Sequence, residues 1–346
     1  MNAASIFDRL AVSLPRPSSF NPAANRFFIE DQPVDPILPL GFLIAGSPLF
    51  ARYAAGARWL RGGERAMRRV WWAGLLGAVG VYAALVLYAA LRGGQPGAPT
   101  ALLLAEAGES AAGLLLILSL GAALLLDFAC LNAAFRALEQ GAVNDLLRLS
   151  RVSNRGIIVS HYAAVRLTGW RWMIAVFHLR LVGAAALVAC RFVFLPLAEH
   201  LTLGSASSGL NGFDQMIEYA ITLCLGVVFV LEARWRLDGV SARTLAASAR
   251  RHADLPPVFV GMFSLLRLWI VQIVALGVIL FFLIALSLVT INFLENSPLP
   301  AALQIALATP CALGITFLLR FFVRRHYSIM TARELLRAER AAFGPP

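Results

Sequence analysis

The sequence predicts an all-α integral membrane protein with six transmembrane helices, both termini cytoplasmic, and additional cytoplasmic amphipathic helices. Of its 346 residues, 59% are hydrophobic and 14% are charged, and the mean hydropathy is +0.74. A soluble domain carries about a quarter charged residues. Several apolar runs reach the roughly 20 residues that a helix needs to cross a bilayer. Because unpaired backbone cannot face lipid, we expect these runs to be helical.

The first 69 residues are predicted to form a cytoplasmic N-terminal region. They contain no charged start followed by an apolar core, so no cleavable signal peptide is expected. The apolar run 37–50 is short for a crossing and contains Pro39 and Pro48. Segments of this length are more often interfacial, so we expect a helix near 37–50 that lies on the inner membrane surface. If this run crossed the membrane instead, the N-terminus would lie outside.

Six apolar runs define a transmembrane domain over residues 70–325. The expected spans are 70–91, 112–134, 172–198, 213–233, 268–293 and 300–322. The flanking segments alternate in charge. Six Arg occur in each of 52–69, 135–171, 234–267 and the part from Arg320 onward, and none in 93–111, 199–213 and 294–299. Arginine-rich loops remain in the cytoplasm. Both termini are therefore predicted to be cytoplasmic in a multi-pass protein of the bacterial inner membrane.

The net charge of +11 also comes from the arginine-rich segments between the spans. All 30 basic residues are Arg, and they gather in the alternating segments, as orientation signals do. We therefore expect the lipid bilayer as a partner and no nucleic acid. The four cysteines are dispersed through apolar runs without CxxC spacing, so they are predicted to be small buried side chains and not metal ligands.

The basic segment 135–171 is predicted to be a cytoplasmic helical loop between the second and third spans. Val143, Leu146 and Leu147 fall on one helical stripe, and Ser153 can cap a second helix. If this helix–turn–helix serves only as a surface connector, its arginines would meet anionic lipid head groups. The C-terminal part 326–346 is predicted to be a cytoplasmic tail with a short amphipathic helix.

The stretch around this loop resembles the permease subunits of type-2 ABC exporters. In that family, the corresponding run goes approximately Glu-x-x-Gly-Thr-x-x-x-Leu-Leu and then turns through Thr-Pro-Leu-Ser. The matching residues here are Glu139, Gly141, Leu146 and Leu147, followed by 149–161. Weaker similarities lie at 21–31 and 237–250. Six spans with both termini inside are also the layout of that family.

The resemblance implies a permease-like subunit that couples to a separate cytoplasmic ABC-type ATPase. The ATPase-coupling surface would comprise Glu139, Asp145, Arg148, Arg151 and Arg155. No GxxxxGK[ST] motif occurs, so ATP would bind the partner subunit, and we expect no enzymatic activity and no cofactor in this chain. The resemblance also implies a homo- or hetero-oligomer of membrane subunits. The spans lack a dense polar lining, which favours an amphiphilic cargo.

A non-transporting role is the alternative, as an accessory or scaffold subunit of a larger respiratory or photosynthetic membrane complex. Departures from the family pattern favour it: Ala142 stands at a Thr position, and Arg151 and Val152 replace Thr-Pro. A membrane enzyme that acts on lipids is a third option. The sequence contains no recognisable catalytic set, which counts against it.

Two ionisable residues are predicted to lie inside the spans at matching depth. Asp127 and Arg180 are each about 10 Å from the inner surface at 1.5 Å per residue. Because charges in a membrane are costly and usually paired, we predict an Asp127–Arg180 ion pair with His178 nearby. The pair would fix the register of the helices or line a substrate path. His178 has no second histidine at its depth, so no haem site is expected.

Other charged residues are predicted to pair near the membrane surfaces. Arg191 lies near the outer end of the third span and can extend toward an acidic neighbour. Its candidate partners are Glu199, Asp214 and Glu218, and Glu232 is expected to pair locally with Arg234 or Arg236.

Overall fold

The computed structural model of the chain describes residues 63–93, 99–139, 154–203, 212–249 and 301–343, with the short pieces 259, 261–263, 265–270 and 277. Within these residues the structure contains helices and no strand, as predicted. The predicted interfacial helix at 37–50 and most of the predicted span 268–293 lie outside the described residues.

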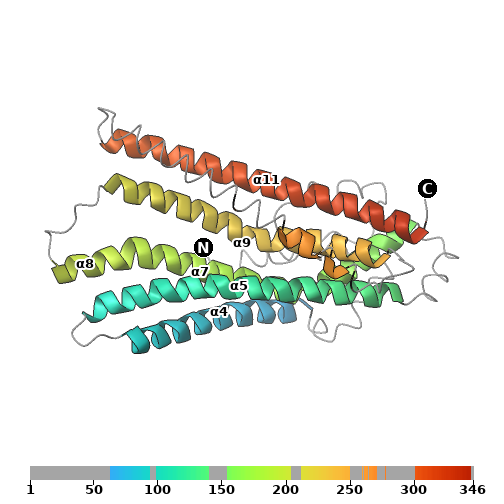
Figure 1. The fold of residues 1–346 in the computed structure, drawn as a ribbon, viewed down its shortest axis with the longest axis horizontal. Helices are drawn as coiled ribbons and strands as arrows, with labels where there is room; N and C mark the ends of the chain where they lie inside the picture. The colour runs from blue at the N-terminus through green and yellow to red at the C-terminus, as the bar shows by residue number, and fades with distance from the viewer. Residues whose placement is uncertain are drawn as a thin grey trace.

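The long helices lie side by side in one elongated bundle (Figure 1). They are α4 (Gly63–Gly93), α5 (Thr100–Glu139), α7 (Asn154–Ala189), α9 (Gly212–Ala249) and α11 (Ala301–Phe343). A π-helical turn, η4 (Cys190–Phe194), joins α7 to α8 (Leu195–Leu203). In Figure 1, α4 and α11 lie at opposite edges of the bundle.

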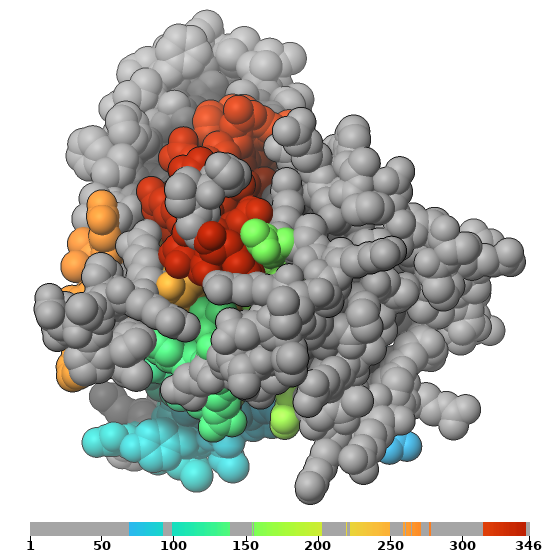
Figure 2. All heavy atoms as spheres, turned by 90° about the vertical axis from the view of Figure 1, so that its right-hand side faces the viewer, coloured from blue at the N-terminus to red at the C-terminus, as the bar shows by residue number. Residues whose placement is uncertain are grey.

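The two ends of the bundle differ. The C-terminal ends of α5, α9 and α11 lie at one end together with the start of α7, and we call this the extension end (Figure 1). The end of α4 and the starts of α5, α9 and α11 lie at the other, which we call the loop end. Figure 2 looks onto the extension end and shows the tip of α11 beside that of α5.

Three described helical segments are long and apolar enough to cross a membrane: Arg69–Arg92, Thr100–Leu138 and Gly156–Thr202. They contain the predicted spans 70–91, 112–134 and 172–198, so the structure supports a helical membrane protein. The predicted span 213–233 falls within α9, and residues 301–322 of the predicted span 300–322 fall within α11. A total of six spans, and the sidedness of the termini, stay predictions.

The helices are longer than a membrane requires. With 40 residues, α5 is about 60 Å long, twice the hydrocarbon thickness of a bilayer. Large exposed apolar side chains form a belt over the loop-end part of the bundle. The belt ends near Phe128 on α5, Trp172 on α7, Val227 on α9 and Phe322 on α11. Past these points, the exposed large apolar residues described on the four helices are Ile329 and Leu336 of α11. The parts that project past the belt, 129–139, 154–171, 237–249 and 328–343, form what we call the helical extension.

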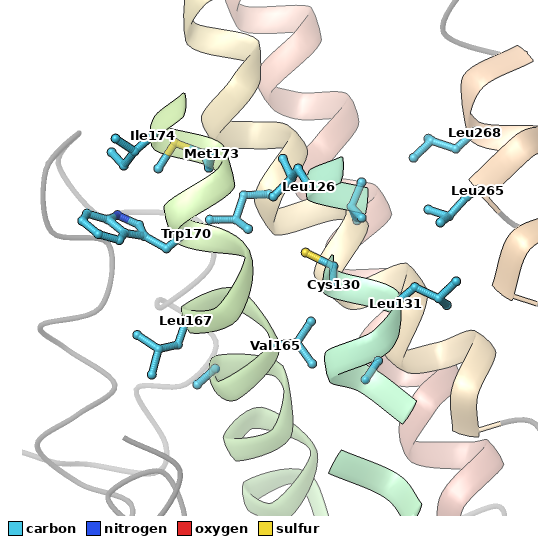
Figure 3. Packing of buried hydrophobic residues seen from close by; sticks show 14 residues of the cluster. Leu126, Cys130, Leu131, Val165, Leu167, Trp170, Met173, Ile174, Leu265 and Leu268 are labelled. Atoms are coloured by element: carbon cyan, nitrogen blue, oxygen red, sulfur yellow. The ribbon is translucent and has the colours of Figure 1, made fainter. Parts of the chain in front are cut away.

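The main apolar core lies where the belt gives way to the helical extension. Leu126, Cys130, Trp170, Met173 and Leu237 are among its buried members, contributed by α5, α7 and α9. Figure 3 shows Leu265 and Leu268 approaching this core from another side. A second cluster inside the helical extension comprises Ile158, Tyr162, Ala242, Leu245, Ala246, Ala249 and Ala338. The projecting helices therefore have a core of their own.

Three segments are more continuous than the sequence predicted. Residues 93–111 were predicted to be a loop, but α5 begins at Thr100. Residues 154–171 do not form a separate surface helix, because they continue without a break into the third span as α7. The amphipathic tail is likewise the last part of the 43-residue helix α11. For the segments of α7 and α11, packing in the second cluster keeps the apolar faces buried and stabilises the continuous helices.

The π-helical turn η4 accommodates a proline. Pro196 cannot donate a backbone hydrogen bond, and its ring would clash with a carbonyl in a regular helix. In η4 the Leu195 amide donates to the Cys190 carbonyl, five residues back, which widens the helix just before Pro196. Arg191 in this turn pairs with Glu109 of α5 at 3.4 Å, a partner that the sequence did not indicate. The side chains of the predicted partners Asp214 and Glu218 are not described.

The crossing of α7 with α5 and α9 predicts a sensitive glycine. A Cβ added at Gly169 would lie 2.6 Å from Cys130 Sγ and 2.7 Å from Leu237 Cδ1. Gly169→Val should therefore lower the free energy of unfolding by about 1–3 kcal/mol, measured by thermal unfolding in detergent. Gly77→Val on α4 is the matched control, since no atom lies within 4 Å of its added Cβ. Equal destabilisation by the two variants would contradict this packing.

Candidate functional site

Three buried ionisable side chains and one partly buried one, Glu232, form a continuous chain of ion pairs across three helices. In order they are Asp127 of α5, Arg236 and Glu232 of α9, and Arg180 of α7. Glu232 and Arg236 are one helical turn apart, so they lie on the same face of α9 and point between the neighbouring helices. We call these four residues the charge chain.

The contact between Asp127 and Arg236 is a two-point pair. Arg236 donates from Nε to Asp127 Oδ1 at 3.1 Å and from Nη2 to Oδ2 at 2.5 Å. The side chains are 1% and 3% exposed, so almost no water reaches the pair. Trp269 Nε1 donates to the same Asp127 Oδ2 at 2.8 Å, and the Arg236 guanidinium lies 4.3 Å from the Trp269 ring centre. Both ions are thus enclosed by specific partners, as burial requires.

Glu232 connects three helices. It accepts from Arg180 Nη1 of α7 at 2.5 Å, lies 3.6 Å from Arg236 Nη1, and accepts the hydroxyl of Tyr327 of α11. Arg180 Nη1 also donates to the Phe229 carbonyl at 2.8 Å. Burial raises the pKa of Tyr327, and the neighbouring Glu232 carboxylate raises it further, so Tyr327 stays protonated and donates.

The charge chain is electrically balanced, with two guanidinium groups and two carboxylates. Taking an ion out of water costs several kcal/mol, and the loss is offset only when its partners are in place. The chain reaches from inside the apolar belt to its edge: Arg180 adjoins exposed Leu181 within the belt, Asp127 adjoins Phe128, and Arg236 follows the last exposed apolar residues of α9. A balanced set of charges at this height ties α5, α7, α9 and α11 together at the edge of the membrane domain.

The predicted direct ion pair between Asp127 and Arg180 is corrected by the structure. Asp127 pairs with Arg236, and Arg180 pairs with Glu232. The prediction matched two residues by depth and assigned Arg236 to a loop, although α9 continues as a helix to Ala249. The expected contact of Glu232 with Arg236 is present, and their spacing on one helix face was the signal that could have extended the pair into a chain.

His178 lies apart from these ion pairs. Its ring is 4.3 Å from that of Trp71 and packs edge-on against it, and its Nδ1 is 2.9 Å from the Ile174 carbonyl oxygen. Among the described residues, no hydrogen-bond partner is found for the buried Nε2. Burial among aromatic rings, and not the charge chain, therefore defines its surroundings.

The predicted ATPase-coupling residues lie at or beyond the ends of described helices. Glu139 is the last residue of α5 and Arg155 is the second of α7, and their side chains are not described. Asp145, Arg148 and Arg151 lie outside the described residues. In the part of the chain that the structure covers, no cluster of His, Cys, Asp and Glu could hold a metal ion.

The chain matches no family model, no curated protein and no solved structure.

The charge chain predicts strong coupling between Asp127 and Arg236. Asp127→Asn should destabilise the protein by about 3–5 kcal/mol, because it leaves the Arg236 guanidinium buried without its counter-ion. Adding Arg236→Gln should recover part of this loss in a double-mutant cycle measured by thermal unfolding. Glu109→Gln, which removes the more exposed pair with Arg191, is the control and should change stability by no more than about 1 kcal/mol. Additive effects of the two buried substitutions would contradict the pairing.

Proposed function

We propose that the chain is the permease-like transmembrane subunit of an ABC exporter, driven by a separate cytoplasmic ATPase. The observation that carries the proposal is the continuity of the helices. α7, α9 and α11 run without a break from the apolar belt, past the charge chain, into the helical extension. A subunit that is moved by a partner outside the membrane needs such rigid connections.

The tip of the helical extension is the proposed docking point of the ATPase. α5 ends there at Glu139 and α7 begins there at Asn154, and the sequence between them contains most of the stretch that resembles the coupling segment of exporters. From Arg236 to the end of α9 at Ala249 is about 20 Å at 1.5 Å per residue. Pressure on the tip would therefore act at a distance from the membrane.

The helical extension is packed firmly enough to transmit such a displacement. Ile158 and Tyr162 of α7 lie in one buried cluster with Leu245 of α9 and Ala338 of α11. Arg166 of α7 also forms an ion pair with Asp238 of α9 at 2.7 Å. Since packed interiors resist compression, movement of one helix moves the others.

The charge chain is the proposed point about which the helices change their arrangement. Glu232 has partners on α7, α9 and α11, and a carboxylate can accept several hydrogen bonds at once. Exchange among Arg180, Arg236 and Tyr327 would let the helices shift without leaving a buried ion unpaired. Alternating access requires an element of this kind with two discrete arrangements.

The bacterial inner membrane, with the helical extension on the cytoplasmic side, is part of the same proposal. Arg136, Arg166, Arg171 and the arginines of α11 from Arg324 onward lie on the extension side of the apolar belt, whereas the connections 94–98 and 204–211 contain no Arg in the sequence. This asymmetry supports an extension that faces the cytoplasm.

Co-purification in mild detergent tests the proposal. The tagged full chain should bring down a stoichiometric ATPase, identified by mass spectrometry. Glu139→Arg should abolish the association, because it reverses a charge at the proposed contact. Glu109→Arg, the same change near the loop end, should leave it intact, and both variants should elute as the wild-type protein does.

Recovery with redox or pigment-binding subunits and no ATPase would overturn the permease proposal. That result would support the alternative, a non-transporting accessory subunit of a larger membrane complex. Retention of the ATPase by Glu139→Arg would leave the pairing of subunits in place but refute this contact surface.

A further inference from the structure

Exposed arginines surround the bundle at the height of the charge chain. They are Arg69 of α4, Arg267 of the helical piece 265–270, and Arg324 and Arg325 of α11. We call these four residues the boundary arginines. All are exposed, in contrast to the buried Arg180 and Arg236.

Neighbouring contacts fix the height of each boundary arginine. Arg69 is two residues from Trp71, whose ring packs against His178. Arg267 is two residues from Trp269, which bonds Asp127. Arg325 is two residues from Tyr327, which donates to Glu232. The four side chains therefore lie within about one helical turn of the buried ion pairs.

Each boundary arginine has large exposed apolar neighbours. Trp72 follows Arg69 closely on α4, and Phe321 and Phe322 precede Arg324 on α11, each of the three being about half or more exposed. The Arg325 guanidinium lies 5.9 Å from the Phe321 ring centre. Arg267 lies between exposed Phe263 and Ile270, so it reaches water only by extending along the helix. Aromatic and basic side chains in this combination are typical of the membrane–water interface.

No described carboxylate at this height balances these exposed charges. Asp127 and Glu232 are paired within the charge chain, and Asp238 pairs with Arg166. The described Glu106, Glu109 and Glu199 lie toward the loop end. Arginine binds phosphate through two parallel N–H donors, and an uncompensated ring of arginines at an interface attracts anionic groups.

We propose that the boundary arginines bind the phosphate head groups of anionic phospholipids in the leaflet nearest the helical extension. The arginines lie on different flanks of the bundle, and this distribution favours a membrane surface as the partner. The α4 helix, the 259–277 pieces and α11 lie on different flanks of the bundle (Figure 2), and α4 and α11 are at opposite edges (Figure 1). A compact soluble ligand could contact only one flank, whereas a membrane surface surrounds them all.

Lipid selectivity of the reconstituted full chain tests the proposal. The protein would be placed in phosphatidylcholine vesicles with trace spin-labelled phosphatidylglycerol or spin-labelled phosphatidylcholine, and the immobilised fraction of each label measured by electron spin resonance. The wild-type chain should prefer phosphatidylglycerol by about five-fold or more, the factor expected of one arginine near an anionic surface. The preference should fall as salt rises.

Two matched triple variants distinguish lipid binding by the boundary arginines from a general effect of positive charge on the protein. Arg267→Gln, Arg324→Gln and Arg325→Gln together should reduce the preference to near one. Arg333→Gln, Arg337→Gln and Arg340→Gln remove the same charge from exposed positions farther along α11 and should leave the preference unchanged. Unfolding temperature and elution volume establish that both variants fold.

Equal selectivity in the two triple variants would overturn the proposal, as would equal immobilisation of both labels by the wild-type chain. Loss of selectivity on addition of free inorganic phosphate at constant ionic strength would assign the site to a soluble anion and also overturn it. The ATPase association plays no part in this readout, so the two proposals stand or fall separately.

Discussion

The two-point contact between Asp127 and Arg236 is the constraint on which the arrangement of the bundle depends. Apolar packing around Leu126 and Trp170 is favourable but non-directional, so it limits the sliding of helices only weakly. Ion pairs removed from water are directional and intolerant of displacement, because each unpaired ion costs several kcal/mol. Through Glu232 and its partners, the same constraint reaches α7 and α11 and sets the helices at one height.

This constraint lies between two halves of the bundle that differ in their exposed surface. Toward the loop end, large apolar side chains face outward, as a lipid environment requires. Small residues bring the helices close together in both halves: Gly169 approaches Cys130 and Leu237 toward the extension end, and Gly183 approaches Leu116 toward the loop end. The half toward the extension end adds buried ion pairs to this packing, so the charge chain and the helical extension are held as one mechanical unit.

The sequence allowed the helical membrane class and the first three spans to be predicted because hydropathy measures the property that the bilayer selects. It could not indicate that α5, α7 and α11 continue as helices past the apolar belt, since polar helical segments and polar loops have similar hydropathy. The Asp127–Arg180 prediction failed for the same reason. Arg236 lies in a segment that hydropathy assigns to a loop, so it was not considered as a partner of Asp127. The two residues are also far apart in the sequence, so no local pattern indicates their pairing.

Arginine at this height has two distinct roles, and burial separates them. Arg180 and Arg236 are enclosed by carboxylates and rings, so their charge is cancelled within the protein. The boundary arginines lie within a turn of them but are exposed, and no described carboxylate balances their charge. Because both sets are attached to the same rigid helices, a membrane surface held by the outer set is also held at the level of the inner one. The helices would then pivot where the bilayer ends, which leaves the helical extension free to move in water while the apolar belt stays in lipid.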